Sequence, residues 1–460
     1  MSDHETNTAL EPAIIVVFGI TGDLAQRKLL PALYHLFKDK LVHEHTEIVG
    51  LSRQDLQVDD LLQKVELCVL EQDNVCDPEV MRAIRSHLRM LQIDPANADD
   101  YGRLLESLNA IETEHGVCMN RLYYLSVPPS VYGAVVQNLG EHGLNTSCQH
   151  GTAATRLLVE KPFGYDEASG KELITHTERY FSEEQIFRID HYLAKESAQN
   201  ILTFRRHNPV FASIWDGKHI TRINIVAHEK IGVEGRGGFY DDVGALRDLV
   251  QSHLLQLLAL VMCDLSGNED DIALHDAKQK LLASLRPIDP STTVRAQYEG
   301  YKQEVENENS HTESFVRLQL ASSLPQWEGT TVAIETGKAL ESKKTEIEVV
   351  FDDSKGSLNE LTFRIQPNEG IDLQLTAKKP GFTQKMQRVR MDFSYHGVFD
   401  EPSHPDAYER VLVDAAAGDH SLFATSDEVI ASWQALQPIL DYWRTTDGLK
   451  IYSPGSEGPV

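Results

Sequence analysis

The segment at residues 13–24 constrains the fold more than any other part of the chain. Residues 13–18 form a short apolar run (Ala-Ile-Ile-Val-Val-Phe), which is typical of a strand buried on both faces of a parallel sheet. A glycine-containing turn follows at residues 19–25, and a helical pattern of leucines comes next. Glycines between a strand and a helix let backbone amides approach a pyrophosphate, and the helix amino end adds partial positive charge. The segment therefore predicts the first β–α unit of a dinucleotide-binding fold.

The turn after this run is interpreted as a cofactor loop because of its position. Its spacing is Gly-x-x-Gly-x-x-Ala rather than the commoner Gly-x-Gly-x-x-Gly, and a glycine turn without a ligand is the ordinary alternative. A turn that follows the first strand of a parallel sheet is nevertheless where this fold binds a dinucleotide. The residues that we expect to contact the cofactor are Gly19, Thr21, Gly22, Asp23 and Leu24.

Arg53 is the residue that bears on the choice between NAD and NADP. It follows the second predicted strand, residues 47–51, at the point where dinucleotide folds select a ribose 2′-hydroxyl or a 2′-phosphate. An acidic residue here would accept a hydrogen bond from the hydroxyl, whereas an arginine offers a fork of donors to a phosphate. We therefore expect NADP, with NAD as a weaker or alternative acceptor.

The second half of the chain has the pattern of a different fold class. Apolar residues alternate with polar ones at 316–320, 347–351 and 361–365. A spacing of two predicts strands of an antiparallel or mixed sheet with one covered face. The predicted architecture is therefore an α/β Rossmann-like NADP-binding domain at residues 1–185, followed by an α+β domain with a large, mostly antiparallel sheet at residues 186–460.

Charge and cysteine content exclude several function classes. The formal net charge of −27 argues against a nucleic-acid-binding surface and against binding to anionic membranes. The 5 cysteines are scattered without a Cys-x-x-Cys pair, so we expect reduced thiols and no metal site. Residues 1–12 are polar and acidic rather than signal-like, and the longest apolar stretch is too short for a membrane span. We expect a cytoplasmic protein.

The run Arg-Ile-Asp-His-Tyr-Leu-Ala-Lys-Glu at residues 188–196 concentrates chemically active side chains. His191, Tyr192 and Lys195 can all donate hydrogen bonds, and such a set suits a dianionic phosphate. Asp190 cannot bind that anion and is better suited to orient a catalytic base. In a helix, Asp190 and Lys195 would lie on roughly opposite sides. The ordinary alternative is a solvated helix start with a capping aspartate.

Two further segments combine reactive side chains with positions that suit a site. Lys161 follows a predicted buried strand, in the sequence Glu-Lys-Pro-Phe-Gly, where open α/β sheets bind ligands. His253 lies on an apolar helical segment, and a histidine in such a place is most often a core residue rather than a catalyst. Asp248 precedes it by five residues, so an α-helix would direct the two side chains to different edges of one cavity.

Taken together, these segments resemble the glucose-6-phosphate dehydrogenase family. The turn at residues 19–25 is similar to the family's cofactor loop, and residues 188–196 are similar to its active-site signature. The Glu-Lys-Pro-Phe-Gly run and the Arg-Asp-x-x-x-x-His pattern of residues 247–253 also match, in the family's order. The resemblance covers most of the chain, and the main departure is Ala194, where the family usually has glycine.

The resemblance implies a reaction and a set of site residues. The implied reaction is oxidation of glucose 6-phosphate at C1 to 6-phosphogluconolactone with hydride transfer to NADP, the first oxidative step of the pentose phosphate pathway. The implied base is His253, and Asp190 would orient its ring. The residues implied to bind substrate are Lys161, His191, Tyr192, Lys195, Glu229, Asp248, Lys338 and Lys343, with Lys161 also expected beside the cofactor.

The resemblance also bears on assembly and on a second nucleotide. Family members are dimers or tetramers, so we expect a homodimer or a homotetramer. Mammalian members hold a structural NADP with aromatic and basic residues that follow a Gln-Pro-Asn-Glu run. Here residues 370–374 supply an acid and an amide instead, and we expect the structural NADP to be absent.

Two other functions remain as alternatives. One is a related two-domain dehydrogenase that acts on another sugar phosphate. The other is a catalytically silent regulator that senses NADP. Such a regulator would keep the loop at residues 19–25 and Arg53, but it would have little reason to keep Asp190 and His253.

Overall fold

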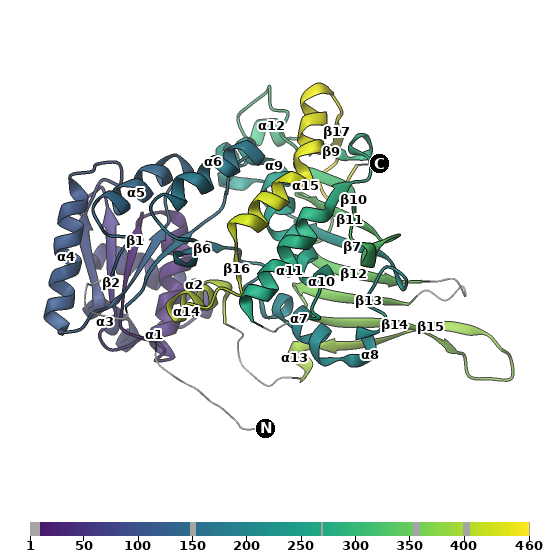
Figure 1. Cartoon of the computed structure of the whole chain (residues 1–460), viewed down its shortest axis with the longest axis horizontal. Helices are drawn as coiled ribbons and strands as arrows, with labels where there is room; N and C mark the ends of the chain where they lie inside the picture. Colours follow the sequence, from purple (N-terminus) through teal and green to yellow (C-terminus); the bar gives the residue numbers. More distant parts are fainter. Residues whose placement is uncertain (1–9, 148–152, 268–269, 353–358, 399–404, 460) are drawn as a thin grey trace. The chain divides into compact units, whose positions relative to one another are not determined.

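The chain folds into two compact units, each built on its own β-sheet (Figure 1). The computed structural model describes residues 10–147, 153–267, 270–352, 359–398 and 405–459. Unit 1 comprises Met1–Phe163, Lys171–Ala194 and Pro405–Ser426, and unit 2 comprises Gly164–Gly170, Lys195–His404 and Asp427–Val460. Each unit is described by itself below.

Unit 1 is organised around a 7-stranded sheet in the order β16-β6-β5-β4-β1-β2-β3. All neighbouring strands are parallel except β16, which is antiparallel to β6. The parallel strands have the order of a dinucleotide-binding fold, which reverses between β1 and β4. The strands are β1 (Ala13–Phe18), β2 (Glu47–Ser52), β3 (Leu88–Gln92), β4 (Asn120–Leu125), β5 (Thr155–Val159), β6 (Ile186–Ile189) and β16 (Phe423–Ala424).

Helices pack on both faces of this sheet. On one face, apolar side chains of α1, α2, α3 and α14 form a core cluster with those of β1 and β4. On the other face, Phe18 of β1 stacks with Tyr101 of α4, with ring centroids 6.2 Å apart. The helices of unit 1 are the π-helix η1 (Ala25–Leu29), α1 (Leu30–Lys38), α2 (Val58–Asp73), α3 (Pro78–His87), α4 (Asp100–His115), α5 (Pro129–Glu141), the 3-10 helix η2 (Glu183–Gln185) and α14 (Ala407–Ala417), while α6 (Glu167–Glu178) begins in unit 2 and ends in unit 1.

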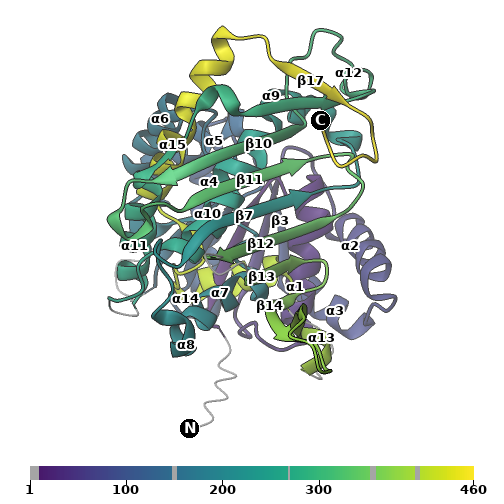
Figure 2. The ribbon, with the colours of Figure 1, turned by 90° about the vertical axis from the view of Figure 1, so that its right-hand side faces the viewer.

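Unit 2 contains a 10-stranded sheet, which Figure 2 shows face-on. Its order is β15-β14-β13-β12-β7-β11-β10-β9-β17, and β8 pairs with β10. The pairs β7–β11 and β9–β17 are parallel, and the other pairs are antiparallel. The strands are β7 (Ile220–His228), β8 (Leu285–Pro287), β9 (Val294–Tyr298), β10 (Phe315–Ser322), β11 (Thr331–Gly337), β12 (Lys344–Phe351), β13 (Glu360–Gln366), β14 (Gly370–Lys378), β15 (Met386–Ser394) and β17 (Leu449–Tyr452).

One face of this sheet is covered by helices, as its alternating apolar pattern requires (Figures 1 and 2). In β7, Ile223, Ile225 and Ala227 are buried, while the residues between them are partly exposed. The helices of unit 2 are α7 (Glu196–His207), α8 (Pro209–Ala212), η3 (Glu234–Arg236), α9 (Gly237–Ala245), the π-helix η4 (Leu246–Leu254), α10 (Leu255–Met262), α11 (Asp271–Ser284), η5 (Pro290–Thr292), α12 (Tyr301–Glu304), η6 (Pro325–Trp327), α13 (Tyr395–Val398) and α15 (Ser426–Thr445).

The predicted fold class is confirmed, and the expectation of reduced thiols is wrong at one cysteine. Cys118 is disulfide-bonded, which the sequence did not reveal because spacing along a chain does not show which thiols meet in space. Cys68, Cys76 and Cys263 are free thiols, as expected. Within the described ranges, every helix is too short or too polar to span a membrane.

Candidate functional site

The predicted cofactor residues of unit 1 gather at one edge of its sheet. The carboxyl ends of the parallel strands are aligned, because Phe18 pairs with both Leu51 and Leu125, and Leu125 pairs with Val159. The glycine turn follows β1, Arg53 follows β2, Lys161 comes shortly after β5 and Asp190 follows β6. Open α/β sheets bind ligands at this edge, at the point where the strand order reverses.

The glycine turn after β1 is tightly folded and packs against the residue that follows β4. Gly19 has a φ of +76°, and a Cβ atom there would lie 2.3 Å from the carbonyl oxygen of Ser126, which follows β4. The amide of Gly22 donates to the carbonyl of Gly19 at 2.8 Å, so the turn closes on itself. Only glycine satisfies both the dihedral angle and the close approach at position 19.

The remaining predicted cofactor residues are at the surface of this edge. Thr21 and Asp23 are exposed, Leu24 is half-buried, and Asp23 forms an ion pair with the exposed Arg27 at 2.7 Å. Arg53 is exposed, and among the described residues its guanidinium forms no hydrogen bond or ion pair. Its five N–H donors are therefore available to a phosphate.

A network beside β5 holds His191, one of the predicted phosphate ligands. Tyr124 donates its hydroxyl to Glu160 Oε1 at 2.5 Å, and His191 Nε2 lies 3.2 Å from Glu160 Oε2. The imidazole also stacks on the ring of Tyr408, with centroids 4.2 Å apart. Burial raises the pKa of Glu160, but His191, the Tyr124 hydroxyl and Lys161 together hold that pKa below its ordinary value. Glu160 is thus an anion that orients a histidine.

The segment after β6 is a tight turn, so the expectation of helical spacing between Asp190 and Lys195 is wrong. Asp190 Oδ1 accepts from the backbone amide of Tyr192 at 2.9 Å, and its carbonyl accepts from Leu193 at 3.1 Å. Helix α7 begins at Glu196, with Lys195 in the N-cap position. The carboxylate of the buried Asp190 stabilises this turn, because it accepts a hydrogen bond from a backbone amide of the turn itself. His191, Tyr192 and Lys195 are all half-buried.

Three predicted substrate residues of unit 2 meet at one end of the larger sheet. Gly337 and Lys344 both pair with His228, so Glu229, Lys338 and Lys343 lie just beyond aligned strand ends. Lys338 Nζ forms an ion pair with the carboxylate of Glu229. Lys343 is exposed in the turn before β12. The sheet end therefore presents a cation and an anion side by side.

Tyr240 lies under this ion pair and was not singled out from the sequence. Lys338 Nζ is 5.0 Å from the centre of its ring. Burial raises the pKa of Tyr240 well above its ordinary value, and the nearby carboxylates of Asp248, Glu313 and Glu229 raise it further. Its hydroxyl is buried and forms no hydrogen bond with any residue that the structure describes. Tyr240 thus packs beside Lys338, in surroundings made negative by three carboxylates.

The helix with the predicted base is a π-helix, and this changes the expected relation of Asp248 to His253. In η4 (Leu246–Leu254), backbone hydrogen bonds join residues i and i+5, and each turn is wider than in an α-helix. Asp248 and His253 are therefore directed closer to one side of the helix than α-helical spacing would direct them. His253 is only 4% exposed, whereas Asp248 is half-buried. π-Helical segments occur frequently at functional sites.

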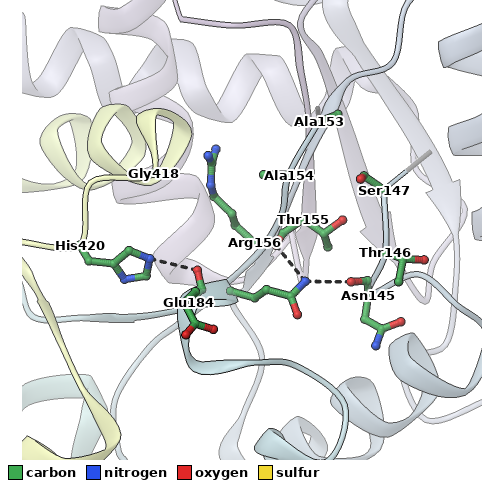
Figure 3. Close-up of a pocket in the computed structure, with 11 residues that line it drawn as sticks. Asn145, Thr146, Ser147, Ala153, Ala154, Thr155, Arg156, Glu184, Gly418 and His420 are labelled. Atoms are coloured by element: carbon green, nitrogen blue, oxygen red, sulfur yellow. Dashed lines mark hydrogen bonds between the residues drawn. The ribbon is translucent and has the colours of Figure 1, made fainter. Parts of the chain in front are cut away.

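A cavity of about 610 Å³ in unit 1 contains none of the predicted site residues (Figure 3). It lies at the amino end of β5, on the edge of the sheet opposite to the glycine turn. Figure 3 shows His420 in contact with the backbone carbonyl of Glu184. The side chain of Gln185 donates to the backbone carbonyl of Asn145. The cavity lies away from the sheet edge that carries the predicted cofactor residues, and we assign it no function.

Models of one protein family match almost the whole chain. The NAD binding domain of glucose-6-phosphate dehydrogenase matches residues 16–200, and the C-terminal domain of the same enzyme matches residues 202–460. The chain belongs to the glucose-6-phosphate dehydrogenase family. The resemblance inferred from the motifs is thereby confirmed, and the cofactor of the first domain is a nicotinamide dinucleotide.

Relatives and solved structures of glucose-6-phosphate dehydrogenases agree with this membership. Glucose-6-phosphate 1-dehydrogenase of Aggregatibacter actinomycetemcomitans is 37% identical, over 98% of this chain and 94% of the relative. A structure of glucose-6-phosphate dehydrogenase in complex with its substrate glucose 6-phosphate has a TM-score of 0.91 at 32% identity, covering 98% of this chain and 96% of that one. A second such enzyme, from Mycobacterium avium, has a TM-score of 0.86 at 32% identity, covering 98% and 95%.

Proposed function

We propose that this chain oxidises glucose 6-phosphate at C1 to 6-phosphogluconolactone with NADP as the acceptor, the first oxidative step of the pentose phosphate pathway. The observation that carries this function is the presence of Asp248 and His253 on one π-helix, in a chain whose relatives are named glucose-6-phosphate 1-dehydrogenases. An acid and an imidazole on one helix suit binding of a sugar hydroxyl and removal of its proton.

His253 is the proposed general base. Its imidazole takes the proton of the C1 hydroxyl as C1 is oxidised, a transfer for which histidine is the side chain that enzymes use most often. Asp190 is proposed to orient the ring and to stabilise the imidazolium, by analogy with carboxylate–histidine pairs in hydrolases. The two residues belong to different units, so this pairing rests on their chemistry and on the family motifs.

The proposed substrate ligands divide by chemistry. Lys161 binds the C1 hydroxyl beside the cofactor, and Glu229, Asp248 and Lys338 bind other sugar hydroxyl groups. His191, Tyr192 and Lys195 bind the phosphate, and Lys343 adds to that clamp. Three observations support these roles: Glu160 orients His191, Lys338 pairs with Glu229, and Lys343 is exposed. Binding of the remote phosphate positions C1, so glucose without a phosphate should react poorly.

The proposed dinucleotide ligands are the glycine turn and Arg53. The bound nicotinamide supplies the hydride acceptor. The backbone of the turn binds the pyrophosphate through Gly19, Thr21, Gly22, Asp23 and Leu24, and the uncommitted guanidinium of Arg53 binds the 2′-phosphate. We propose a preference for NADP over NAD, and one NADP per subunit without a structural second one.

Steady-state turnover of glucose 6-phosphate with NADP and with NAD tests this function. We expect turnover with NADP, and a fall of the NADP/NAD ratio of kcat/KM by about tenfold or more in Arg53→Ala, because a charge-assisted contact to phosphate is lost. Arg82→Ala is a matched control, since Arg82 is an exposed arginine of the same unit that forms an ion pair with Glu79. Parent protein that binds NADP but leaves glucose 6-phosphate unchanged would contradict the proposal.

We further propose a cytoplasmic homodimer or homotetramer. The family resemblance supports the assembly. The net charge of −27 supports the location, because a high net charge keeps a protein in solution. Light scattering of the purified chain measures the mass of the assembly, and a monomer at all concentrations would contradict the proposal.

A further inference from the structure

A buried glutamate caps the π-helix that carries Asp248 and His253. Glu313 precedes β10 and is 3% exposed. Its Oε1 atom accepts a hydrogen bond of 3.0 Å from the amide of Leu246, the first residue of η4. Its backbone carbonyl accepts another, of 2.9 Å, from the amide of Ala245. Two donors at the helix start, which no residue of that helix can satisfy, are thus satisfied by one residue.

The chain just before the helix is shaped to admit this carboxylate. Gly244 has a φ of +73° and a ψ of 170°, which kinks α9 two residues before η4 begins. A Cβ atom on Gly244 would lie 2.6 Å from Glu313 Oε1. The carboxylate therefore occupies space that only a glycine leaves open, and both the kink and the first turn of η4 are fitted to Glu313.

The electrostatic surroundings favour a capping role for this residue. Burial raises the pKa of Glu313, while the charge of Arg247 and the amide of Leu246 oppose that rise. Arg247 itself is held by backbone groups, since its Nε donates to the carbonyl of Tyr165 at 2.8 Å. The principal role of the Glu313 carboxyl is thus to accept a hydrogen bond from the backbone amide of Leu246 at the helix start. An uncharged side-chain amide oxygen can accept the same bond.

We propose that Glu313 is a positioning residue for the reaction, because it fixes the first turn of η4 and thereby the placement of Asp248 and His253. This inference rests on the proposed function of His253. Glu313 acts through the helix and contacts neither substrate nor cofactor. A displacement of reacting groups by about 1 Å costs up to about a hundredfold in rate, so losing the cap should affect kcat.

Three variants test the proposal in the full chain. In Glu313→Ala, we expect kcat for glucose 6-phosphate to fall by about tenfold or more. The dissociation constant for NADP should stay unchanged, since its proposed ligands belong to unit 1. In Glu313→Gln, the amide oxygen still accepts from Leu246, and kcat should recover to within about threefold of the parent. Asp270→Ala is the matched control, because it removes the cap of α11 in the same unit and should leave kcat unchanged.

Further readouts separate this proposal from failure of folding or of the proposed function. Should Glu313→Ala not fold, Glu313→Asp decides, since the shorter side chain is expected to lose the bond to Leu246 and reduce kcat in a folded protein. Should the parent not oxidise glucose 6-phosphate, the NMR signal of His253 in histidine-labelled protein replaces kcat. The His253 signal should shift in Glu313→Ala and keep the position that it has in the parent protein in Glu313→Gln. Parent-like kcat and His253 signal in Glu313→Ala, or equal losses in the alanine and glutamine variants, would overturn the proposal.

Discussion

His191 is held on two sides by residues whose role was not evident from the sequence. Glu160 binds Nε2, and the ring of Tyr408 packs against the imidazole face. Tyr124 in turn fixes the other oxygen of Glu160. A histidine held in this way presents a defined edge to a ligand without losing rotamer entropy on binding. The proposed role of both supporting residues is to position His191.

Glu160→Ala should therefore weaken substrate binding more than turnover. We expect KM for glucose 6-phosphate to rise about tenfold, which corresponds to about 1.4 kcal/mol, with kcat within about twofold of the parent. Asp216→Ala is the matched control, because it removes another carboxylate–histidine pair, Asp216 with His219 at 2.7 Å, that contains no predicted site residue. Initial rates at saturating NADP measure both constants. A loss confined to kcat would contradict the positioning role of Glu160.

Ala194, the departure from the family signature, should have little influence on substrate choice. Its side chain is 2% exposed and belongs to the apolar core cluster of unit 1, together with Ile189 and Tyr408. In Ala194→Gly, we expect the preference for glucose 6-phosphate over other hexose phosphates to change less than about threefold. Stability should fall by roughly 1 kcal/mol, through the lost methyl group and the added backbone freedom. A tenfold change in the ratio of kcat/KM values would show that this methyl group shapes the pocket.

At the scale of elements, a buried ionic network joins three helices of unit 2. Glu428 of α15 accepts from His275 of α11 at 2.7 Å and from Gln256 of α10 at 3.0 Å, and pairs with Lys278 of α11 at 3.0 Å. The side chains of Lys278 and Glu428 are both 0% exposed. Removing one partner of such a pair leaves the other charge buried without compensation.

Lys278→Met should accordingly be strongly destabilising. We expect the free energy of unfolding to fall by about 3–5 kcal/mol, measured by urea denaturation. The double variant Lys278→Met with Glu428→Leu should recover a large part of that loss, because no buried charge remains unpaired. A loss below about 1 kcal/mol in the single variant would mean that the pair contributes little.

The same network predicts a dependence of stability on acid. Burial raises the pKa of Glu428, but Lys278 and His275 hold it below its ordinary value of 4.5. A carboxyl whose pKa is lower in the folded state contributes stability fully above its ordinary value, and that contribution is lost as pH falls through the folded value. The difference in unfolding free energy between the parent and Glu428→Gln should therefore shrink below about pH 4.5. A difference that grows on acidification would contradict this sign.

The sequence predicted elements well where burial leaves a simple pattern. The continuous apolar run of β1 was predicted at its true bounds, whereas β3 follows α3 directly, without turn residues, and carries the polar residues Arg89 and Gln92. The π-helical form of η4 leaves no distinct spacing in the sequence, so the spatial relation of Asp248 and His253 could not be predicted from it. Glu313 was missed because its partner Leu246 is 67 residues away, and no local pattern reports such a contact.

At the scale of the whole molecule, the proposed functions are divided between the two units. The glycine turn and Arg53 belong to unit 1, and His253, Glu229 and Lys338 belong to unit 2. Within a chain of net charge −27, the proposed ligands of the anionic substrate include four lysines: Lys161, Lys195, Lys338 and Lys343. Local cations of this kind offset an unfavourable overall field. The division also means that one unit can be disabled while binding by the other is measured.

Turnover of glucose 6-phosphate by His253→Asn, measured together with NADP binding, tests the central claim most directly. Loss of a general base should lower kcat by about 100-fold to 10,000-fold, while the dissociation constant for NADP stays that of the parent. His219→Asn, a histidine of the same unit outside the proposed site, should retain parent activity. Near-parent turnover in His253→Asn would contradict the assignment of the base and the mechanism built on it.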